Sequence, residues 1–281
     1  MHFLPTRCTD EAYVQYVQLF SDCFPKSDKF SSDYLDWLYR CNPDGEVIGF
    51  DAFDNDRLIA HYACIPAQAY IGGEKVNVLL SLNTATHPDY QGQGLFLKLA
   101  EMTYAAGTEQ GYDCVYGIAN ANSTPGFTRK LMFQLVGTLT AKVGIGAMRI
   151  NFSHSQPAQF QRIWSKQALE WRCANPINPI LTRTTDDRTT FSAPALMGKF
   201  CMATAELHNI NPISSQKFNT SPLHLFIGKI PSSWETKSLF FNIPEKLKPS
   251  PLNLIYRSLS GRIQHINIEN VFLSFLDFDA Y

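Results

Sequence analysis

The stretch HPDYQGQGLFLKLAEM, from His87 to Met102, carries more information about the fold than any other part of this chain. Its polar loop Gln91-Gly92-Gln93-Gly94 is followed at once by apolar residues at helical spacing. Glycines in such a loop serve either a plain turn that needs positive φ or a cradle in which a helix N-terminus binds phosphate. The loop lacks the three glycines of a dinucleotide site and the Gly-Lys-Ser/Thr of a nucleoside triphosphate site.

The remaining interpretation is a pyrophosphate loop for acyl-coenzyme A. In such a loop, backbone N–H groups and the positive end of a helix dipole bind the diphosphate. A strand, then Gln-x-x-Gly, then a helix fits this arrangement better than it fits a bare turn.

The residues around the loop predict alternating helices and antiparallel strands. Turn signals at Asp54-Asn55-Asp56 and at Gly72-Gly73 divide the segment before the loop into three antiparallel strands. The third strand covers about Val76–Thr86 and leads directly into the glycines. Apolar spacing and breakers predict the other elements: helices at Asp10–Phe24, Asp33–Arg40, Phe96–Gly107 and Thr128–Met132, and strands at Val115–Asn120 and Gln134–Lys142.

Two short stretches in different halves of the chain resemble each other. LDWLYRCNP begins at Leu35 and LEWRCANP begins at Leu169, and their tryptophans, Trp37 and Trp171, are 134 positions apart. Duplication of a domain of about 140 residues would explain the match, and coincidence over a short stretch is the alternative. Aligning the two stretches requires a gap of one residue.

The second half predicts a weaker pattern of short elements. WSKQALEW is helical in character, LHLFIGKI, KSLFFNI, IQHINIEN and NVFLSFLDFDAY resemble strands, and PSPLNLIYRSLSGR is compatible with a helix that ends at Gly261. No glycine-rich phosphate loop recurs there. We therefore expect a mixed α/β (α+β) protein of two tandem domains, residues 1–145 and 146–281, each a mostly antiparallel twisted sheet flanked by helices, with the second domain degenerate.

Composition limits the function classes. The chain has 281 residues, of which 45% are hydrophobic and 17% charged, and its net charge is −1. These values support a sizeable core and argue against broad electrostatic capture of nucleic acid or a membrane surface. The seven cysteines are scattered without a Cys-x-x-Cys pair, which indicates reduced thiols and no zinc site. We expect a cytoplasmic protein that binds small molecules and no metal.

HPDYQGQGLFLKL resembles the cofactor motif of the GCN5-related N-acetyltransferase (GNAT) superfamily, which is Arg or Gln, two residues, Gly, one residue, then Gly or Ala. Gln91 and Gly94 match the motif, whereas Phe96 stands where Gly or Ala is usual. Downstream, CVYGIANAN is similar to the strand that follows in the family, and FTRKLMFQLVG is similar to its closing Tyr…Gly-Phe segment. The resemblance covers about residues 10–144.

The resemblance implies acyl-coenzyme A as co-substrate and direct attack of an amine on the thioester. It implies that the strand Leu80–Thr86 presents backbone groups to the pantetheine and the oxyanion, and that Asn122, near the end of the next strand, lies by the cofactor. The implied contacts are with the pantetheine at Asn83, Thr84, Ala85 and Thr86, and with the pyrophosphate at Gln91, Gly92, Gln93, Gly94, Leu95 and Phe96.

Few residues are candidates for catalysis. His61 alternates with apolar neighbours on a strand, which suits either a core histidine or a base. Asn83 interrupts an apolar strand and must be hydrogen-bonded if it is buried, and Asn120 ends the fifth strand, where the family commonly has an Asn. His87 is better suited to the turn before Pro88.

The closing motif and the C-terminal segment contain the positions where a general acid or a further carboxylate of the active site would be expected. Many relatives carry a Tyr as general acid, and Thr128 occupies that position here, so the sequence does not support a Tyr-type acid. Some tandem members direct their C-terminal segment into the active site, which would bring in Asp277, Asp279 or the carboxylate of Tyr281.

The overall plan resembles sugar N-acyltransferases of bacterial surface-polysaccharide pathways. This implies transfer of an acetyl or 3-hydroxybutanoyl group to a dTDP-linked 3-amino-3,6-dideoxyhexose, with the nucleotide held by the second domain. Trp234, Trp164 or Tyr256 could stack on the base, although core packing suits each of them as well. Alternatives are N-acetylation of a peptide, polyamine or aminoglycoside, or a non-catalytic acyl-coenzyme A-binding module.

Overall fold

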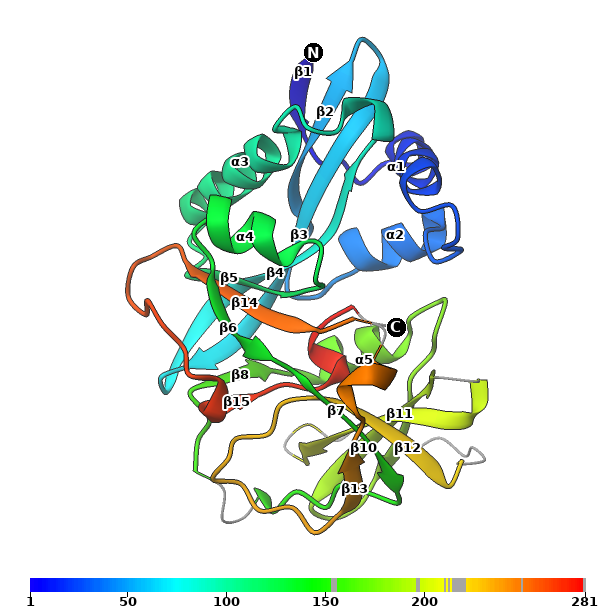
Figure 1. The fold of residues 1–281 in the computed structure, drawn as a ribbon, viewed down its shortest axis with the longest axis vertical. Helices are drawn as coiled ribbons and strands as arrows, with labels where there is room; N and C mark the ends of the chain where they lie inside the picture. Colours follow the sequence, from blue (N-terminus) through cyan, green and yellow to red (C-terminus); the bar gives the residue numbers. More distant parts are fainter. Residues whose placement is uncertain are drawn as a thin grey trace.

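The structure contains two β-sheets stacked along the long axis of the molecule (Figure 1). This computed structural model describes residues 1–152, 156–195, 198–209, 211, 213, 221–248 and 250–279. Four helices from the first half flank the first sheet, and a single α-helix of the second half lies between that sheet and the second one (Figure 1). The predicted mixed α/β class with mostly antiparallel sheets is confirmed.

The first sheet has the strand order β1-β2-β3-β4-β5-β14-β6. Along this order the neighbouring strands are antiparallel except for β4 and β5, which run parallel. Two short strands, β8 and β15, extend it beside β3. The bounds are β1 (His2–Pro5), β2 (Ile48–Asp54), β3 (Arg57–Ile71), β4 (Glu74–Thr86), β5 (Cys114–Ala119), β6 (Gln134–Thr138), β8 (Phe160–Ile163), β14 (Asn253–Ser258) and β15 (Val271–Phe272).

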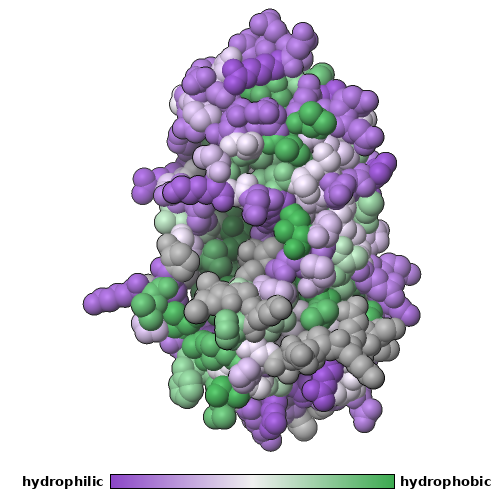
Figure 2. All heavy atoms as spheres, turned by 90° about the vertical axis from the view of Figure 1, so that its right-hand side faces the viewer, coloured by the Kyte–Doolittle hydropathy of each residue, from purple (hydrophilic) through white to green (hydrophobic). Residues whose placement is uncertain are grey.

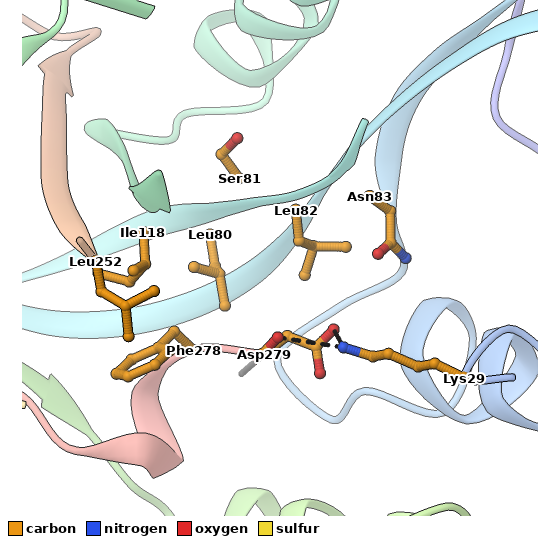
Figure 3. Close-up of a pocket in the computed structure, with 9 residues that line it drawn as sticks. All are labelled: Lys29, Leu80, Ser81, Leu82, Asn83, Ile118, Leu252, Phe278 and Asp279. Carbon is orange, nitrogen blue, oxygen red and sulfur yellow. Dashed lines mark hydrogen bonds and ion pairs between the residues drawn. The ribbon is translucent and has the colours of Figure 1, made fainter. Parts of the chain in front are cut away.

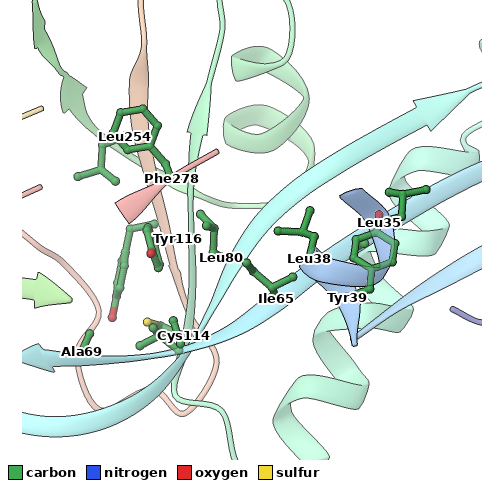
Figure 4. Close-up of a cluster of buried hydrophobic side chains, with 14 of the residues drawn as sticks. Leu35, Leu38, Tyr39, Ile65, Ala69, Leu80, Cys114, Tyr116, Leu254 and Phe278 are labelled. Atoms are coloured by element: carbon green, nitrogen blue, oxygen red, sulfur yellow. The ribbon is translucent and has the colours of Figure 1, made fainter. Parts of the chain in front are cut away.

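Helices cover both faces of the first sheet, because the strands in its centre carry apolar residues on both sides. α1 (Asp10–Cys23) and α2 (Ser32–Tyr39) pack on one face, and α3 (Leu95–Glu109) and α4 (Thr124–Lys130) pack on the other. Thr9 and Ser31 cap α1 and α2 through their hydroxyl groups. Figure 4 shows Leu35, Leu38 and Tyr39 of α2 in the hydrophobic core on this face of the sheet, beside Ile65 and Leu80 of the strands.

The second sheet has the order β13-β7-β12-β11-β10-β9. Its strands are β7 (Thr140–Ile145), β9 (Leu181–Thr184), β10 (Arg188–Ala195), β11 (Gly198–His208), β12 (Leu223–Gly228) and β13 (Leu239–Asn242), and its helix is α5 (Lys166–Cys173). Short 3₁₀ helices complete the described elements: η1 (Pro88–Tyr90), η3 (Glu245–Leu247), η4 (Ile268–Asn270) and η5 (Phe275–Asp277).

The two sheets repeat one topology and exchange a strand. In β2-β3-β4-β5 and in β9-β10-β11-β12, two antiparallel pairs are followed by one parallel pair. β14, from the second half, then lies between β5 and β6, and β7, from the first half, lies between β12 and β13. Each half therefore completes the sheet of the other.

The tryptophans of the repeated stretch meet at the contact between the halves. The indole N–H of Trp37 donates to the carbonyl of Trp171 at 2.9 Å, and that of Trp171 donates to the carbonyl of Trp37 at 2.8 Å. Their rings stack at 4.9 Å, and Ser31 and Ser165 cap α2 and α5 in the same way. This internal symmetry supports the duplication. The division into domains at residue 145 stays a prediction, because strands cross that boundary in both directions.

Several expected elements differ from the structure. The predicted helix before Gly261 is wrong: Asn253–Ser258 forms β14, a central strand. Residues 263–270 hold only η4 and no strand. The single strand expected at Gln134–Lys142 is divided into β6 and β7, because the chain passes from one sheet to the other at Leu139. α4 begins at Thr124, earlier than expected. Within the described residues, no helix is both long and apolar enough to span a membrane.

Candidate active site

The first sheet opens between its two parallel strands. β4 and β5 pair only from Val78–Ser81 to Cys114–Gly117. Beyond Ser81, β4 continues to Thr86 without β5, while β5 keeps its pairing with β14 up to Ala119. The edge of β4 that faces β5 is therefore available to an extended ligand, since a strand edge offers unpaired N–H and C=O groups.

A β-bulge at Asn83 marks the start of this opening. Tyr62 of β3 lies opposite Thr84 and Ala63 lies opposite Leu82, so Asn83 is the additional residue. Its φ is +42°, a conformation that a non-glycine residue adopts only when its surroundings enforce it. Bulges of this kind redirect the strand and its side chain.

Two cavities adjoin the bulge. The larger, about 490 Å³, lies between the separated strands, and its walls include Asn83, Thr84, Asn120 and Asn122. The smaller, about 220 Å³, is lined by Lys29, Leu80, Ser81, Leu82, Asn83, Ile118, Leu252, Phe278 and Asp279. The two cavities share part of β4 and β5. Figure 3 shows Leu80 and Leu82 pointing toward the smaller cavity while Ser81 points away from it.

The glycine loop is open and its helix is uncapped. Gly92 and Gly94 have φ of +79° and +77°, and a Cβ atom at either position would meet nothing within 4 Å. Gly94 is the N-cap of α3 without any side-chain hydrogen bond, and the first backbone bond of the helix runs from Lys98 to Gly94. The N–H groups at the start of α3 therefore remain for an anion. Gln91 and Gln93 are exposed beside them, and Gln91 donates to the carbonyl of Thr86 at 3.3 Å.

Phe96, the departure from the motif, lies under the loop. Its ring packs edge-to-face on Tyr62 and Phe127, with centroid distances of 5.9 and 5.2 Å, in the core beneath α3 and α4. Leu95 is also buried in that core. Only the backbone groups of these two residues face the loop, so the aromatic ring does not obstruct the cradle.

His61 lies in the core and reaches the cavities only through other residues. It is fully buried, its Nδ1 lies 2.7 Å from Asp51 Oδ1, and its Nε2 lies 2.8 Å from the hydroxyl of Tyr39. The amide of Asn83 donates to the same hydroxyl at 2.9 Å, and Tyr16 donates to the other oxygen of Asp51 at 2.7 Å. This chain of hydrogen bonds ends at the bulge.

One tautomer of His61 satisfies every hydrogen bond from Asp51 to Asn83. With Asp51 ionised, His61 donates from Nδ1 and accepts from Tyr39 at Nε2, which leaves the oxygen of Tyr39 for Asn83. Burial raises the pKa of Tyr39 well above its ordinary value, so its hydroxyl keeps its proton. The network therefore holds the side chain of Asn83, and with it the strained bulge.

The remaining predicted residues have structural partners. The oxygen of the Asn120 side chain accepts from the N–H groups of Asn122 and Ser123, at 3.0 and 2.9 Å, and so forms the turn before α4. Ala85 is buried in the core. Nε2 of His87 lies 2.7 Å from Arg57 beside the loop. Thr128 donates to the carbonyl of Thr124 within α4.

Asp279 supplies a buried carboxylate at the smaller cavity. Its Oδ2 accepts from Lys29 at 2.6 Å (Figure 3). The same oxygen accepts from the hydroxyl of Tyr34 at 2.5 Å. Its Oδ1 is buried and has no hydrogen-bond partner among the described residues. Burial raises the pKa of Asp279, but Lys29 and Arg172 lower it further, so the net pKa lies below the ordinary value. The group is therefore an anion with one uncommitted oxygen.

The structure separates Asp279 from the other acidic candidates near the end of the chain. Asp277 is the last residue of η5 and is buried; it accepts from Trp164 and Ser274, and burial raises its pKa. Tyr281 lies outside the described residues. Sequence reasoning did not find Lys29, Leu252 or Phe278, because only the folded chain brings them to the cavity.

The residues considered for base stacking are not placed for it. Trp164 and Tyr256 are buried in the core, with 6% and 1% of their surface exposed. Trp234 is half-buried and packs on Phe272 at 4.8 Å. None of the three lines either cavity at Asn83.

The surface of the molecule is hollowed on the side that carries α1 and α2. Figure 2 shows this hollow near mid-height, with hydrophobic atoms inside it.

A comparison with known protein families finds one match. The family model described as Acetyltransferase (GNAT) domain matches residues 5–136, a little under half of the chain. No curated protein sequence matches this chain significantly.

Solved structures match most of the chain. A GCN5-related N-acetyltransferase from Kribbella flavida superimposes with a TM-score of 0.60 at 10% identity, over 92% of this chain and 71% of that one. One from Anabaena variabilis gives 0.55 at 13% identity, over 92% and 73%. A probable N-acyltransferase from Enterococcus faecalis gives 0.55 at 11%, also over 92% and 73%. At these identities the likeness shows a common fold.

Proposed function

We propose that the chain is an acyl-coenzyme A-dependent N-acyltransferase that acylates the amine of a small molecule in the cavity beside Asn83, and the match of residues 5–136 to the acetyltransferase (GNAT) domain model supports this. The observation that carries the proposal is the carboxylate of Asp279, which lines the smaller cavity together with Leu80, Leu82 and Asn83 of β4. An anion at this position suits an incoming amine.

The cofactor side of the site fits acyl-coenzyme A. The uncapped start of α3 and the open positions at Gly92 and Gly94 suit the diphosphate, and the free edge of β4 suits the extended pantetheine. Acyl-coenzyme A supplies the acyl group as a thioester: the amine nitrogen forms the new C–N bond, the C–S bond breaks, and a thiolate leaves. Backbone N–H groups around the bulge at Asn83 would stabilise the charge on the carbonyl oxygen.

The acceptor side of the site is built around Asp279. Its carboxylate would attract and orient an ammonium group and take the proton that the amine loses. Lys29 and Tyr34 hold one carboxylate oxygen of Asp279 in place, at the wall of the cavity that Leu80, Leu82 and Asn83 also line. Because a thiol has a pKa of about 8.5, the thiolate leaves without a dedicated acid, which agrees with a Thr at position 128.

His61 acts in this proposal as a positioning residue. Together with Asp51 and Tyr39 it fixes the amide of Asn83, and so fixes the backbone that meets the thioester. This role differs from that of a base, because no atom of His61 lines either cavity.

The proposed acceptor class is an amino sugar, in keeping with the resemblance to sugar N-acyltransferases. The apolar walls at Leu80, Leu82 and Phe278 suit a compact, partly apolar acceptor such as a deoxyhexose, with an acetyl or 3-hydroxybutanoyl donor. A polyamine or aminoglycoside would use the same carboxylate. The stacking of a nucleotide base on Trp164 or Tyr256 is not part of the proposal, since both are buried.

The test is a thiol-release assay with acetyl- and 3-hydroxybutanoyl-coenzyme A against four acceptor groups: dTDP-linked amino sugars, aminoglycosides, polyamines and peptides. We expect turnover with amino sugars and none with N-acetylated forms of the same sugars. Turnover only with another group would overturn the acceptor class while leaving the transfer reaction intact. No turnover with any amine, despite binding of coenzyme A, would overturn the reaction itself.

A further inference from the structure

The second half contains a separate cavity with a concentration of positive charge. It has a volume of about 620 Å³, and its lining residues are Ala147, Arg149, Ile150, Asn151, Arg183, Thr185, Arg188, Thr190 and Lys237. Four of these nine residues are cationic and none is acidic, although the whole chain carries 24 basic and 25 acidic residues. None of them lines the cavities at Asn83.

One wall of this basic cavity is the hairpin of β9 and β10. Thr190 lies directly opposite Arg183 in the register of the two strands, and the N–H of Thr185 bonds the carbonyl of Arg188. Side chains two residues apart on a strand point to the same face. Arg183, Arg188 and the two threonines therefore share one face of the hairpin.

A buried carboxylate attaches the opposite wall to this hairpin. The side chain of Glu206 is fully buried, and it accepts from the N–H groups of Arg149 and Ile150 at 3.0 and 3.1 Å and from Arg188 at 2.8 Å. The N–H of Lys237 in turn bonds the carbonyl of Arg149 at 3.3 Å. Arg149 has a φ of +54°, and strain of this kind persists where the surroundings enforce it.

The cations differ in how far they are already neutralised. Arg188 is paired with Asp187 and Glu206. Arg149, Arg183 and Lys237 have no ion pair within the part of the chain that the structure describes. Three uncommitted positive charges around one cavity match the charge of a diphosphate, and guanidinium groups bind phosphate oxygens in a bidentate manner.

We propose that this basic cavity is a binding site for an organic diphosphate, separate from the acyl-transfer site. Arg149, Arg183 and Lys237 bind the phosphate oxygens. Arg188 is fixed by its ion pair with Glu206 and keeps the wall formed by β9 and β10 in place. The volume falls in the range of small-molecule sites and leaves room beside the phosphates, where Ala147 offers apolar contact. The proposal does not depend on the acyltransferase activity.

The test is calorimetric titration with inorganic pyrophosphate as probe, in the Gly94→Asp background so that the loop before α3 does not compete. We expect saturable binding to one site that weakens as sodium chloride is raised. Arg149→Gln/Lys237→Gln should weaken it at least tenfold, and Arg183→Gln should also weaken it. Lys166→Gln is the matched control, because Lys166 is an exposed cation of the same half on α5.

The outcomes separate the proposal from its rivals. Binding lost in the cavity variants and kept in Lys166→Gln supports the site. Absence of binding, equal weakening in the control, or equal affinity for sulfate at the same ionic strength would each overturn it. Unchanged melting temperatures of the cavity variants verify that they are folded, and Arg149→Lys, which keeps the charge, should retain most of the affinity.

Discussion

The two halves of the molecule share a topology but differ at the loop between their parallel strands. In the first half, β4 leads through the glycine loop into α3 and returns as β5. In the second half, the corresponding connection runs from His208 to Leu223 without a glycine between them, and its described residues form no helix. The parallel pair is thus retained in both halves, whereas the glycine loop between the parallel strands occurs only in the sequence of the first.

The two sheets also differ at the strand before that loop. β4 has the bulge at Asn83, and the sheet opens beyond it. β11 pairs with β10 in an uninterrupted register from Met202 to His208. A sheet can thus be duplicated and stabilised by strand exchange, while the bulge of β4 has no counterpart in the described residues of β11.

The largest expected effect is at the cradle itself. Gly94→Asp places a carboxylate against the diphosphate at the start of α3 and should weaken coenzyme A binding at least about a hundredfold, or roughly 2.7 kcal/mol. Titration calorimetry with coenzyme A measures it. Gly73→Asp is the matched control, because Gly73 also has positive φ and open space around it, in the hairpin between β3 and β4. Equal losses in both variants would show that backbone strain, and not the cradle, was responsible.

The next effect is at the acceptor side of the same opening. Asp279→Asn keeps the shape but removes the anion, and turnover should fall about a hundredfold, within the range for loss of a positioned base, while coenzyme A binding is unchanged. Steady-state thiol release measures it. Asp10→Asn, in the exposed first turn of α1, is the control. Undiminished turnover in Asp279→Asn would remove Asp279 from the mechanism.

The same carboxylate predicts a dependence of stability on pH. The pKa of Asp279 is lowered in the folded state, so its contribution to the free energy of unfolding is present above the unfolded value, about 3.9, and is lost as the pH falls through the folded value. Melting curves should therefore show wild type and Asp279→Asn converging as the pH drops below about 4. A stability difference that grows in acid would contradict the ion pair with Lys29.

A smaller effect is expected in the network that holds the bulge. Tyr39→Phe removes the partner of His61 Nε2 and of the Asn83 amide and should cost about 1–3 kcal/mol of stability, with turnover reduced more than coenzyme A binding. Urea unfolding and thiol release measure the two effects. Tyr256→Phe is the control, since it also removes a buried hydroxyl group, bonded to the carbonyl of Ile263, and should cost stability without changing turnover per folded molecule.

The smallest effect concerns the contact that relates the halves. Trp37→Phe and Trp171→Phe each remove one of the reciprocal N–H bonds, and a double-mutant cycle should show a coupling energy of about 0.5–1.5 kcal/mol. Equilibrium unfolding measures it. Additive effects of the two substitutions would mean that the tryptophans stabilise their own helices and do not join the halves.

Local patterns in the sequence were sufficient for much of the first half. Asn55, Gly72 and Gly73 mark the hairpins where they occur, because a tight turn needs positive φ from neighbouring residues. Gln91 to Gly94 mark the start of α3 for the same reason. The residues from Asn253 to Ser258 were misassigned to a helix, because a strand buried on both faces lacks the alternation that distinguishes it from a helix.

The sequence alone determined which residues can form a phosphate cradle, since that depends on a few consecutive backbone conformations, and it indicated a repeat through Trp37 and Trp171. Only the tertiary structure decided the acceptor side. Lys29 and Asp279 are 250 positions apart, and the partners of His61 come from different elements, so no local pattern could join them. Burial and strand exchange, which depend on the whole chain, placed these charges at the opening that the loop serves.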